Sequence, residues 1–144
     1  MKAKEYFQQV AAAERKLRIL QAKLRHYEDL GLTITSHAGA VGGHQAGLSR
    51  VELAAIGMVD SERYLTDQIS GYLKQIKEAE AIIDRIPQEK YRQILTYRYL
   101  CGWSLSSISD ELRYQDPNSI YRAHGWALAE AQRILNQRKP KETG

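Results

Sequence analysis

Apolar side chains recur along residues 4–30 at alternating intervals of four and three residues. The stripe consists of Tyr6, Val10, Ala13, Leu17, Leu20, Leu24 and Tyr27. Such a repeat places one apolar stripe along a helix, as in helices that pair in coiled coils. Gly31 follows the stripe, and a glycine in this place predicts the end of the helix.

A second stripe of the same kind occupies residues 49–86. It consists of Ala55, Met58, Glu62, Leu65, Ile69, Tyr72, Ile76, Ala79, Ile83 and Ile86. Ser49 and Glu52 have the spacing of a capping box, which predicts that the helix begins there. Residues 31–48 lie between the stripes and hold five glycines together with His37 and His44, so a loop is expected. Residues 1–86 are therefore predicted to form an antiparallel hairpin that serves oligomerisation or interaction.

Residues 87–144 change to shorter helices that are separated by turn residues. Pro87 ends the long helix, and the next helix is expected over residues 88–100, before Gly102. Ser104 is a suitable N-cap for a short helix whose apolar face is Leu105, Ile108 and Leu112. Asp116 and Pro117 have the residue types of an N-cap and a first helical position, which predicts a last helix over residues 117–137. Its inner side is expected to hold Ile120, Ala127, Leu128, Ala131, Ile134 and Leu135.

The expected fold class is therefore all-α: a long, coiled-coil-like antiparallel hairpin over residues 1–86, then a three-helix helix-turn-helix domain over residues 87–144. Charge is distributed unevenly between these parts. Residues 85–144 carry ten Lys and Arg against six Asp and Glu, whereas residues 1–84 carry eleven of each, so the net charge of +4 lies in the last part. Such asymmetry suggests that this part meets a polyanion.

In a helix-turn-helix motif, the N-terminal turns of the second helix enter the major groove. The side chains expected to contact DNA are Ser104, Arg113, Asn118, Ser119, Tyr121 and Arg122. Asn pairs with adenine, Arg with guanine or phosphate, and hydroxyl groups bond phosphate. Arg92 and Arg98, with Arg113, are expected to reach the flanking DNA backbone, and Trp126 is expected in the core or at an interface. From spacing alone, a plain three-helix domain with a solvated polar face stays open as an alternative.

The stretch RQILTYRYLCGWSLSSISDELRYQDPNSIYRAHGWAL resembles region 4 of the sigma-70 factors. The matching residues are Ile94, Leu95, Arg98, Tyr99, Gly102, Ser104, Ile108, Leu112, Ile120, Arg122, Ala127 and Leu128. The whole layout, with MKAKEY and RAHGWAL, is similar to small phage and prophage proteins of Gram-positive bacteria, related to late-gene regulators of the ArpU and RinA kind. Ser107 and Ser109 depart from the usual Glu-Ile-Ala, Arg113 replaces the turn glycine, and the turn QDPNS is one residue longer.

This resemblance implies a sequence-specific DNA-binding transcriptional regulator of phage or prophage genes, acting in the cytoplasm of a bacterial host. The expected partners are double-stranded DNA, RNA polymerase and a second copy in a homodimer. Two alternatives stay open: a DNA-packaging oligomer similar to a small terminase subunit, and a protein-interaction adaptor that acts on host RNA polymerase.

The sequence offers little for other functions. Cys101 is the single cysteine and is expected to serve packing, and the four histidines lack the spacing of metal ligands. Asp110 and Glu111 are adjacent, so they point to different helix faces. We therefore expect no catalytic residues, no metal and no cofactor, and a protein that is not an enzyme. No stretch approaches the roughly 18 apolar residues of a membrane span, so no membrane contact is expected.

Overall fold

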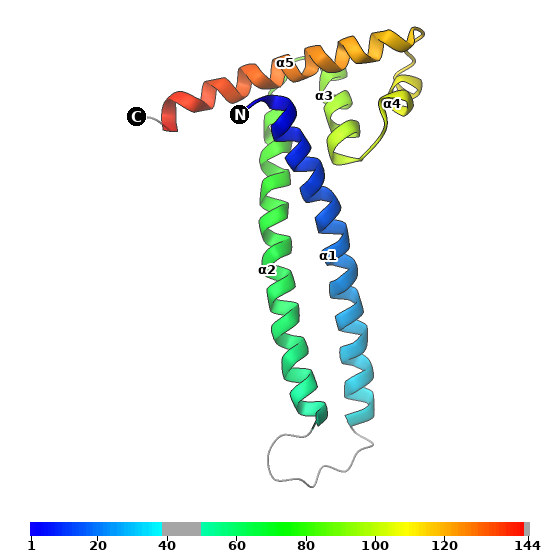
Figure 1. The fold of residues 1–144 in the computed structure, drawn as a ribbon, viewed down its shortest axis with the longest axis vertical. Helices are drawn as coiled ribbons and strands as arrows, with labels where there is room; N and C mark the ends of the chain where they lie inside the picture. The colour runs from blue at the N-terminus through cyan, green and yellow to red at the C-terminus, as the bar shows by residue number, and fades with distance from the viewer. Residues whose placement is uncertain (39–49, 143–144) are drawn as a thin grey trace. The chain divides into compact units, whose positions relative to one another are not determined.

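The computed structural model describes residues 1–38 and 50–142, and the elements within these ranges are helical (Figure 1). The elements in chain order are α1 (Ala3–Ala38), α2 (Arg50–Asp84), α3 (Glu89–Leu95), the π-helical segment η1 (Thr96–Leu100), α4 (Leu105–Glu111) and α5 (Pro117–Glu142). No β-strand occurs in the described ranges, so the expected all-α fold class is confirmed. None of the described helices combines the length and the apolar character needed to cross a membrane.

The chain forms two compact units, and the long helices contribute to both. Unit 1 comprises Met1–Arg15 together with Lys74–Gly144, and unit 2 comprises Lys16–Leu73. This division differs from the predicted boundary at residue 86, because the first turns of α1 and the last turns of α2 belong with the C-terminal helices. Phe7 illustrates the reason: its side chain is fully buried, and its ring centroid lies 5.3 Å from that of Tyr99 in η1.

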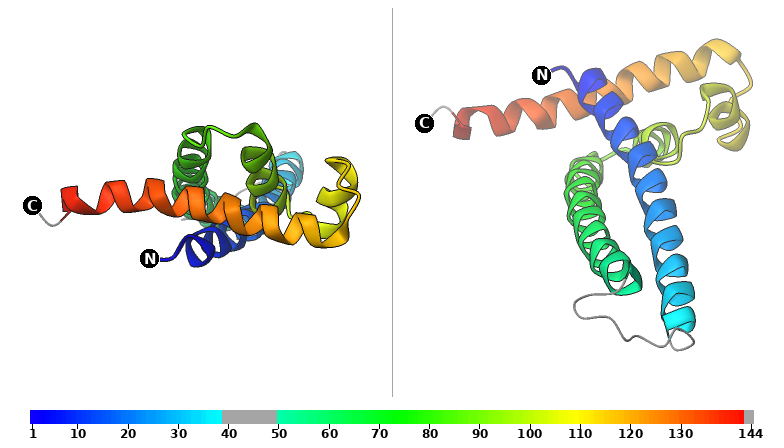
Figure 2. Two further views of the ribbon diagram at one scale, coloured as in Figure 1. Left: turned by 90° about the horizontal axis from the view of Figure 1, so that it is seen from above. Right: turned by 60° about the horizontal axis from the view of Figure 1, so that its bottom comes forward.

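The core of unit 1 forms where α5 passes across α3 and α4 (Figure 2). Its buried centre is Ile94, Ile108, Ile120 and Ala123, and tyrosine, tryptophan and leucine side chains pack around it. The buried residues of α5 are Ile120, Ala123, Ala127, Ala131 and Ile134, with intervals that keep them on one face. Four of the six predicted inner residues of α5 are thus buried, and the other two, Leu128 and Leu135, are half-buried.

Polar contacts also join α1, α2 and α5 within unit 1. The Ala3 backbone N–H donates to the Gln132 side-chain oxygen at 2.6 Å. Arg138 of α5 forms an ion pair of 2.9 Å with Glu78 of α2, and the Tyr6 hydroxyl donates to the same carboxylate at 3.4 Å. Burial and the Glu78 carboxylate raise the pKa of Tyr6 to about 12, so this hydroxyl stays protonated and remains a donor.

The expected end of the first helix is wrong. α1 does not stop at Gly31 but continues to Ala38, so the first part of the predicted loop 31–48 is helical. A glycine inside a helix lowers stability by only about 1 kcal/mol relative to alanine, so it does not have to end the helix. A Cβ at Gly31 would lie 3.8 Å from the Met58 methyl group of α2, which is an ordinary packing distance. Residues 39–49, including His44 and Ser49 of the predicted capping box, lie outside the described residues.

The helix expected over residues 88–100 changes its winding after Leu95. Thr96–Leu100 form the π-helical segment η1, where the Cys101 N–H donates to the Thr96 carbonyl at 3.0 Å. A π-helical turn holds more residues than an α-helical turn, so the side chains that follow it point in different directions than in a continuous α-helix. Tyr99 is consequently buried, whereas Leu100 is half-buried. Cys101, expected to serve packing, is exposed.

Candidate nucleic-acid interface

Both helices of the predicted DNA-reading pair begin with the N-caps that their sequence predicts. The Ser104 hydroxyl accepts from the Ser107 backbone N–H at 3.1 Å, at the start of α4. The Asp116 carboxylate accepts from the Asn118 N–H at 3.0 Å, with Pro117 as the first residue of α5. Each cap satisfies a backbone donor that a helix start leaves free. The two caps thus define where α5 starts and which of its residues form its first turns.

The turn between α4 and α5 has the hydrogen bonds of a Schellman motif, with an arginine in the usual place of glycine. The Arg113 N–H donates to the Asp110 carbonyl at 3.3 Å, and the Tyr114 N–H to the Ser109 carbonyl at 2.9 Å. Arg113 has φ 63°, in the left-handed region that a side chain other than glycine enters at a cost. Tyr114, which follows Arg113 in this turn, packs against the buried cluster of unit 1.

The first turns of α5 present polar side chains on the face opposite its buried stripe. Asn118, Tyr121 and Arg122 are exposed, Tyr121 to 63% and the Arg122 side chain to 60%. Ser119 is half-buried, and Ile120 and Ala123 face the core. The structure therefore brings the four predicted residues of α5 together on two consecutive turns.

Arg122 supplies the positive charge of this face, and three carboxylates lie at its edge. No Asp or Glu occurs in α5 before Glu130, whereas Asp110, Glu111 and Asp116 lie at the end of α4 and at the α5 cap. The Arg122 guanidinium lies 3.7 Å from the Asp116 carboxylate and donates to the Ser119 hydroxyl at 3.4 Å. An exposed pair of this length contributes little to stability, so Arg122 can exchange Asp116 for a phosphate or a guanine edge.

The remaining predicted contact residues have additional or different structural roles. The Ser104 hydroxyl is engaged as a cap and lies 3.0 Å from that of Ser107, although Ser104 is exposed. Arg113 is exposed on the turn. The Arg98 guanidinium donates to the Trp103 carbonyl at 3.0 Å, and Arg92 donates to the Ile86 and Pro87 carbonyls. Arg92 thus satisfies backbone carbonyl groups that follow the end of α2.

Trp126 continues the exposed face of α5, one turn beyond Arg122. Its side chain is 56% exposed, so Trp126 does not lie in the core, and an interface role and a base-stacking role both stay open. The spacing indicates the exposure of Trp126. It stands four residues after exposed Arg122, on the same helix face, and only one residue before the buried Ala127, which lies on another face.

A buried hydrogen bond behind this face was not predicted. The Tyr99 hydroxyl and His124 Nε2 are 2.8 Å apart, joining η1 to α5. Burial lowers the pKa of His124, and the positive charges of Arg98 and Lys4 lower it further, so His124 is neutral at neutral pH. The sequence of a helix does not indicate which distant residue a polar side chain will bond. This pair could not be predicted because it forms only where η1 turns Tyr99 inward.

Within residues 1–38 and 50–142, no three His, Cys, Asp or Glu side chains come together as metal ligands. Comparisons with protein-family models, with curated proteins and with solved structures give no match for this chain. The functional interpretation therefore rests on the residues and geometry of α4, the turn and α5.

Proposed function

We propose that this protein is a sequence-specific DNA-binding transcriptional regulator that reads the major groove with the first turns of α5. The observation that carries the proposal is the exposed row of Asn118, Tyr121 and Arg122 on a helix whose start is defined by the Asp116 cap. Asparagine and arginine are the residue types that pair with two edges of adenine and of guanine, and tyrosine hydroxyls bond phosphate.

The net positive charge of the chain lies in residues 85–144, and the residues from Pro117 to Ala129 include no acidic side chain. Within residues 105–129, Arg113 and Arg122 stand against Asp110, Glu111 and Asp116, so the excess positive charge comes from the segments on either side of this row. The ion-pair partner of Arg122, 3.7 Å away, is an exposed cap carboxylate, which a phosphate can replace at small cost. The resemblance to small phage and prophage proteins adds a target class to this proposal: phage or prophage genes in the cytoplasm of a bacterial cell, with RNA polymerase as a second partner.

The first test is fluorescence anisotropy of the full chain on random duplex DNA and on fragments of its own genome, over a range of salt. A specific fragment should bind on the order of 10³-fold more tightly than random DNA. The slope of log affinity against log salt should be about −0.9 for each phosphate contact. A chain that binds no duplex at low salt would not be a DNA-binding regulator.

Arg122→Ala and Arg133→Ala form a matched pair for locating the reading turns. Their guanidinium groups are exposed to 60% and 57%, and each pairs with one carboxylate, of Asp116 and of Glu130 respectively. Arg133 lies roughly 16 Å further along the helix, beyond a groove about 12 Å wide. Arg122→Ala should reduce specific affinity roughly tenfold or more, while Arg133→Ala should change it little. Equal losses would overturn the assignment of the reading turns.

The adaptor alternative has one observation in its favour, the exposed indole of Trp126. Tryptophan is enriched among the residues that dominate protein–protein binding energy. Purified RNA polymerase that binds the wild-type chain but not Trp126→Ala, with DNA binding unchanged, would support a polymerase contact at this position. The packaging alternative is separated by mass, because small terminase-like oligomers form rings.

A further inference from the structure

Unit 2 exposes more apolar surface than a helical pair in water normally keeps. In the described residues of this unit, six large apolar side chains are 38–63% exposed: Ile19, Leu30, Ile56, Val59, Tyr64 and Leu73. Among the side chains of unit 2 that the structure describes, the buried hydrophobic ones are Leu17, Leu20 and Leu65. Two helices can cover only one stripe on each other, so the rest of this surface needs further helices to bury it.

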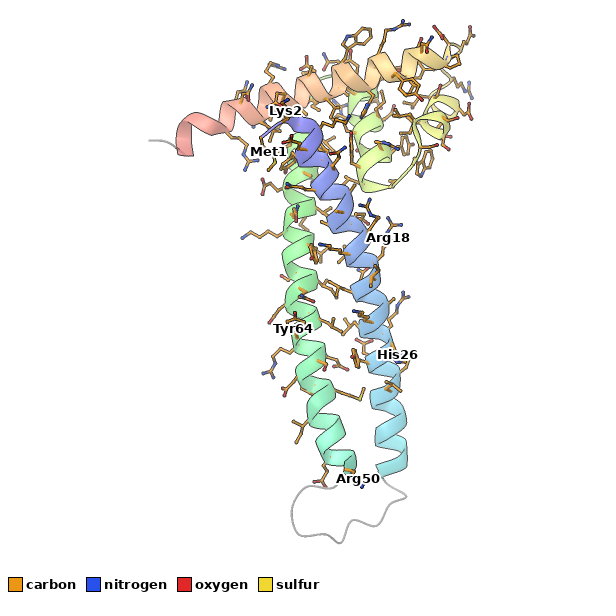
Figure 3. All side chains as sticks on the ribbon, viewed as in Figure 1. Met1, Lys2, Arg18, His26, Arg50 and Tyr64 are labelled. Atoms are coloured by element: carbon orange, nitrogen blue, oxygen red, sulfur yellow. The ribbon has the colours of Figure 1, made fainter. Side chains whose placement is uncertain are left out.

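Part of this surface lines a groove between α1 and α2, inside unit 2. The groove has a volume of about 750 Å³, and its apolar lining includes Ile19 and Tyr64, which are 57% and 63% exposed. Lys23 and His26 line it from α1, and Asp60 lines it from α2. Figure 3 marks His26 and Tyr64 on the two helices. The groove therefore has a basic edge, an acidic edge and an apolar floor.

The net charges of the two helix segments in unit 2 are opposite. Residues 16–38 carry four Lys and Arg against two Asp and Glu, and residues 50–73 carry two against four. The α1 part is thus net +2 and the α2 part net −2. A surface with one basic and one acidic helix is complementary to itself when each helix meets the other type in a partner.

We propose that a second copy of this chain docks on this groove face, with α1 of each copy against α2 of the other. The parts of α1 and α2 in unit 2 are about 35 Å long and, at ordinary helix spacing, cover a width of about 20 Å. The face therefore offers on the order of 700 Å² per copy, close to the roughly 800 Å² per partner of a stable interface. The product is an antiparallel four-helix bundle with two apolar grooves facing each other.

Charge also selects the orientation of the two copies. A two-fold axis parallel to the helices places α1 of each copy on α2 of the other, so +2 meets −2. The other isologous arrangement, with the axis across the helices, places α1 on α1 and α2 on α2, where like charges repel. The favoured axis keeps each residue at its own level along the bundle.

Light scattering of the full chain without DNA tests the dimer. The expected mass is twice that of one chain, and a monomer at concentrations of roughly 100 µM would overturn the proposal, since any contact would then be weaker than a specific interface needs. The proposal does not depend on DNA binding. A monomer that still binds DNA would reject the docking surface and leave the proposed function intact, and a dimer that binds no DNA would do the reverse.

Changes of charge test the orientation. Lys23→Glu brings the net charge of the α1 segment from +2 to 0, and Asp60→Lys brings that of the α2 segment from −2 to 0. Each should therefore weaken dimerisation about tenfold. In the arrangement with α1 on α1, the same changes would remove a repulsion. Single variants that dimerise as tightly as the wild type, or more tightly, would overturn the pairing of α1 with α2.

A matched pair on α2 tests the groove face. Tyr64 and Val59 are exposed to 63% and 53% and stand on the same helix, but only Tyr64 lines the groove. Tyr64→Glu should weaken the dimer about 100-fold, as expected for an aromatic residue at the centre of an interface, whereas Val59→Glu should leave it unchanged. Both variants alter exposed residues and should keep the helix content of the wild-type chain. An equal effect of the two, or no effect of Tyr64→Glu, would overturn the proposal.

Discussion

The two units use the same pair of helices but bury them to different extents. In unit 1, α1 contributes Ala3, Phe7, Val10 and Ala13 to the buried core, and α2 contributes Ile76, Ala79, Ile82 and Ile83. In unit 2, the described side chains of the same helices contribute Leu17, Leu20 and Leu65. The heptad spacing of the two stripes is the same in both units, so spacing alone does not decide how much of a helix becomes core.

The difference follows from the number of helices around each stripe. In unit 1, α3, η1 and α5 add neighbours, so adjacent residues such as Ile82 and Ile83 are both buried at 3% exposure. In unit 2, only α1 and α2 are available, and large apolar residues such as Ile56 and Leu73 stay exposed. An apolar stripe that packs against one neighbouring helix stabilises a hairpin only weakly. An apolar stripe of the same spacing that is surrounded by several helices becomes part of a core.

The largest expected effect that distinguishes the units is on the free energy of unfolding of two leucine variants. Leu95 is fully buried in unit 1 and Leu65 is 5% exposed in unit 2. Leu95→Ala should cost about 3–5 kcal/mol and Leu65→Ala about 2 kcal/mol, because a two-helix surface can close partly around the lost methyl groups. Urea unfolding followed by circular dichroism measures both. A cost for Leu65→Ala that equals that of Leu95→Ala would contradict the comparison.

The pH dependence of stability should come from unit 1 through His124. Its folded-state pKa is lowered by burial and by the charges of Arg98 and Lys4, so the unfolded chain takes up the proton first as pH falls. The contribution of neutral His124 is fully present above the ordinary histidine pKa of about 6.5 and is lost as pH falls from there through the folded-state pKa.

His124→Gln tests this, with His26→Gln as the matched change at an exposed position of unit 2. Urea unfolding between neutral and mildly acidic pH should show a shallower loss of stability for His124→Gln and the wild-type loss for His26→Gln. Unchanged pH dependence in His124→Gln would mean that the hydrogen bond to Tyr99 does not control it.

The sequence predicted the local signals of this fold well. The N-caps at Ser104 and Asp116, the buried face of α5 and the two long stripes depend on residues within a few positions of each other, and the structure confirms them. Phe7 was missed although it is fully buried, because it lies outside the α1 stripe and is covered by Tyr99, far away in the sequence. Burial of this kind depends on tertiary neighbours that periodicity does not specify.

In the candidate site, too, some features were predicted from local sequence and others were not. The exposed row on α5 was predicted from residue types and spacing, since a capped helix with a clear inner face determines its outer face. The use of Arg92 to hold the Ile86 and Pro87 carbonyls was not predicted, because it depends on where α2 ends and α3 begins. The exposure of Trp126 was also not predicted, although its spacing from Arg122 and Ala127 indicates it.

Arg113→Gly should raise stability in unit 1 by about 1 kcal/mol, because glycine adopts the left-handed conformation of this turn without the steric cost of a side chain. Arg113→Lys keeps the cost and the charge and should leave stability unchanged. If Arg113 also contacts the DNA backbone as proposed, the glycine variant should bind DNA more weakly although it is more stable. Thermal unfolding and anisotropy on the same samples measure both quantities, and a glycine variant no more stable than the wild type would show that the turn is unstrained.

The smallest expected effects compare two glycines inside helices, Gly71 in unit 2 and Gly125 in unit 1. A Cβ added at either meets nothing within 4 Å, so alanine at each should stabilise by about 0.5–1 kcal/mol. Gly125 lies on the exposed face of α5, next to Trp126 and one turn after Tyr121, whereas Gly71 lies in the unit proposed to dimerise. Gly125→Ala should therefore weaken DNA binding if this part of α5 approaches the duplex closely, and Gly71→Ala should not. Equal stabilisation with unchanged DNA binding in both variants would limit the DNA-reading surface to the first two turns of α5, before Gly125.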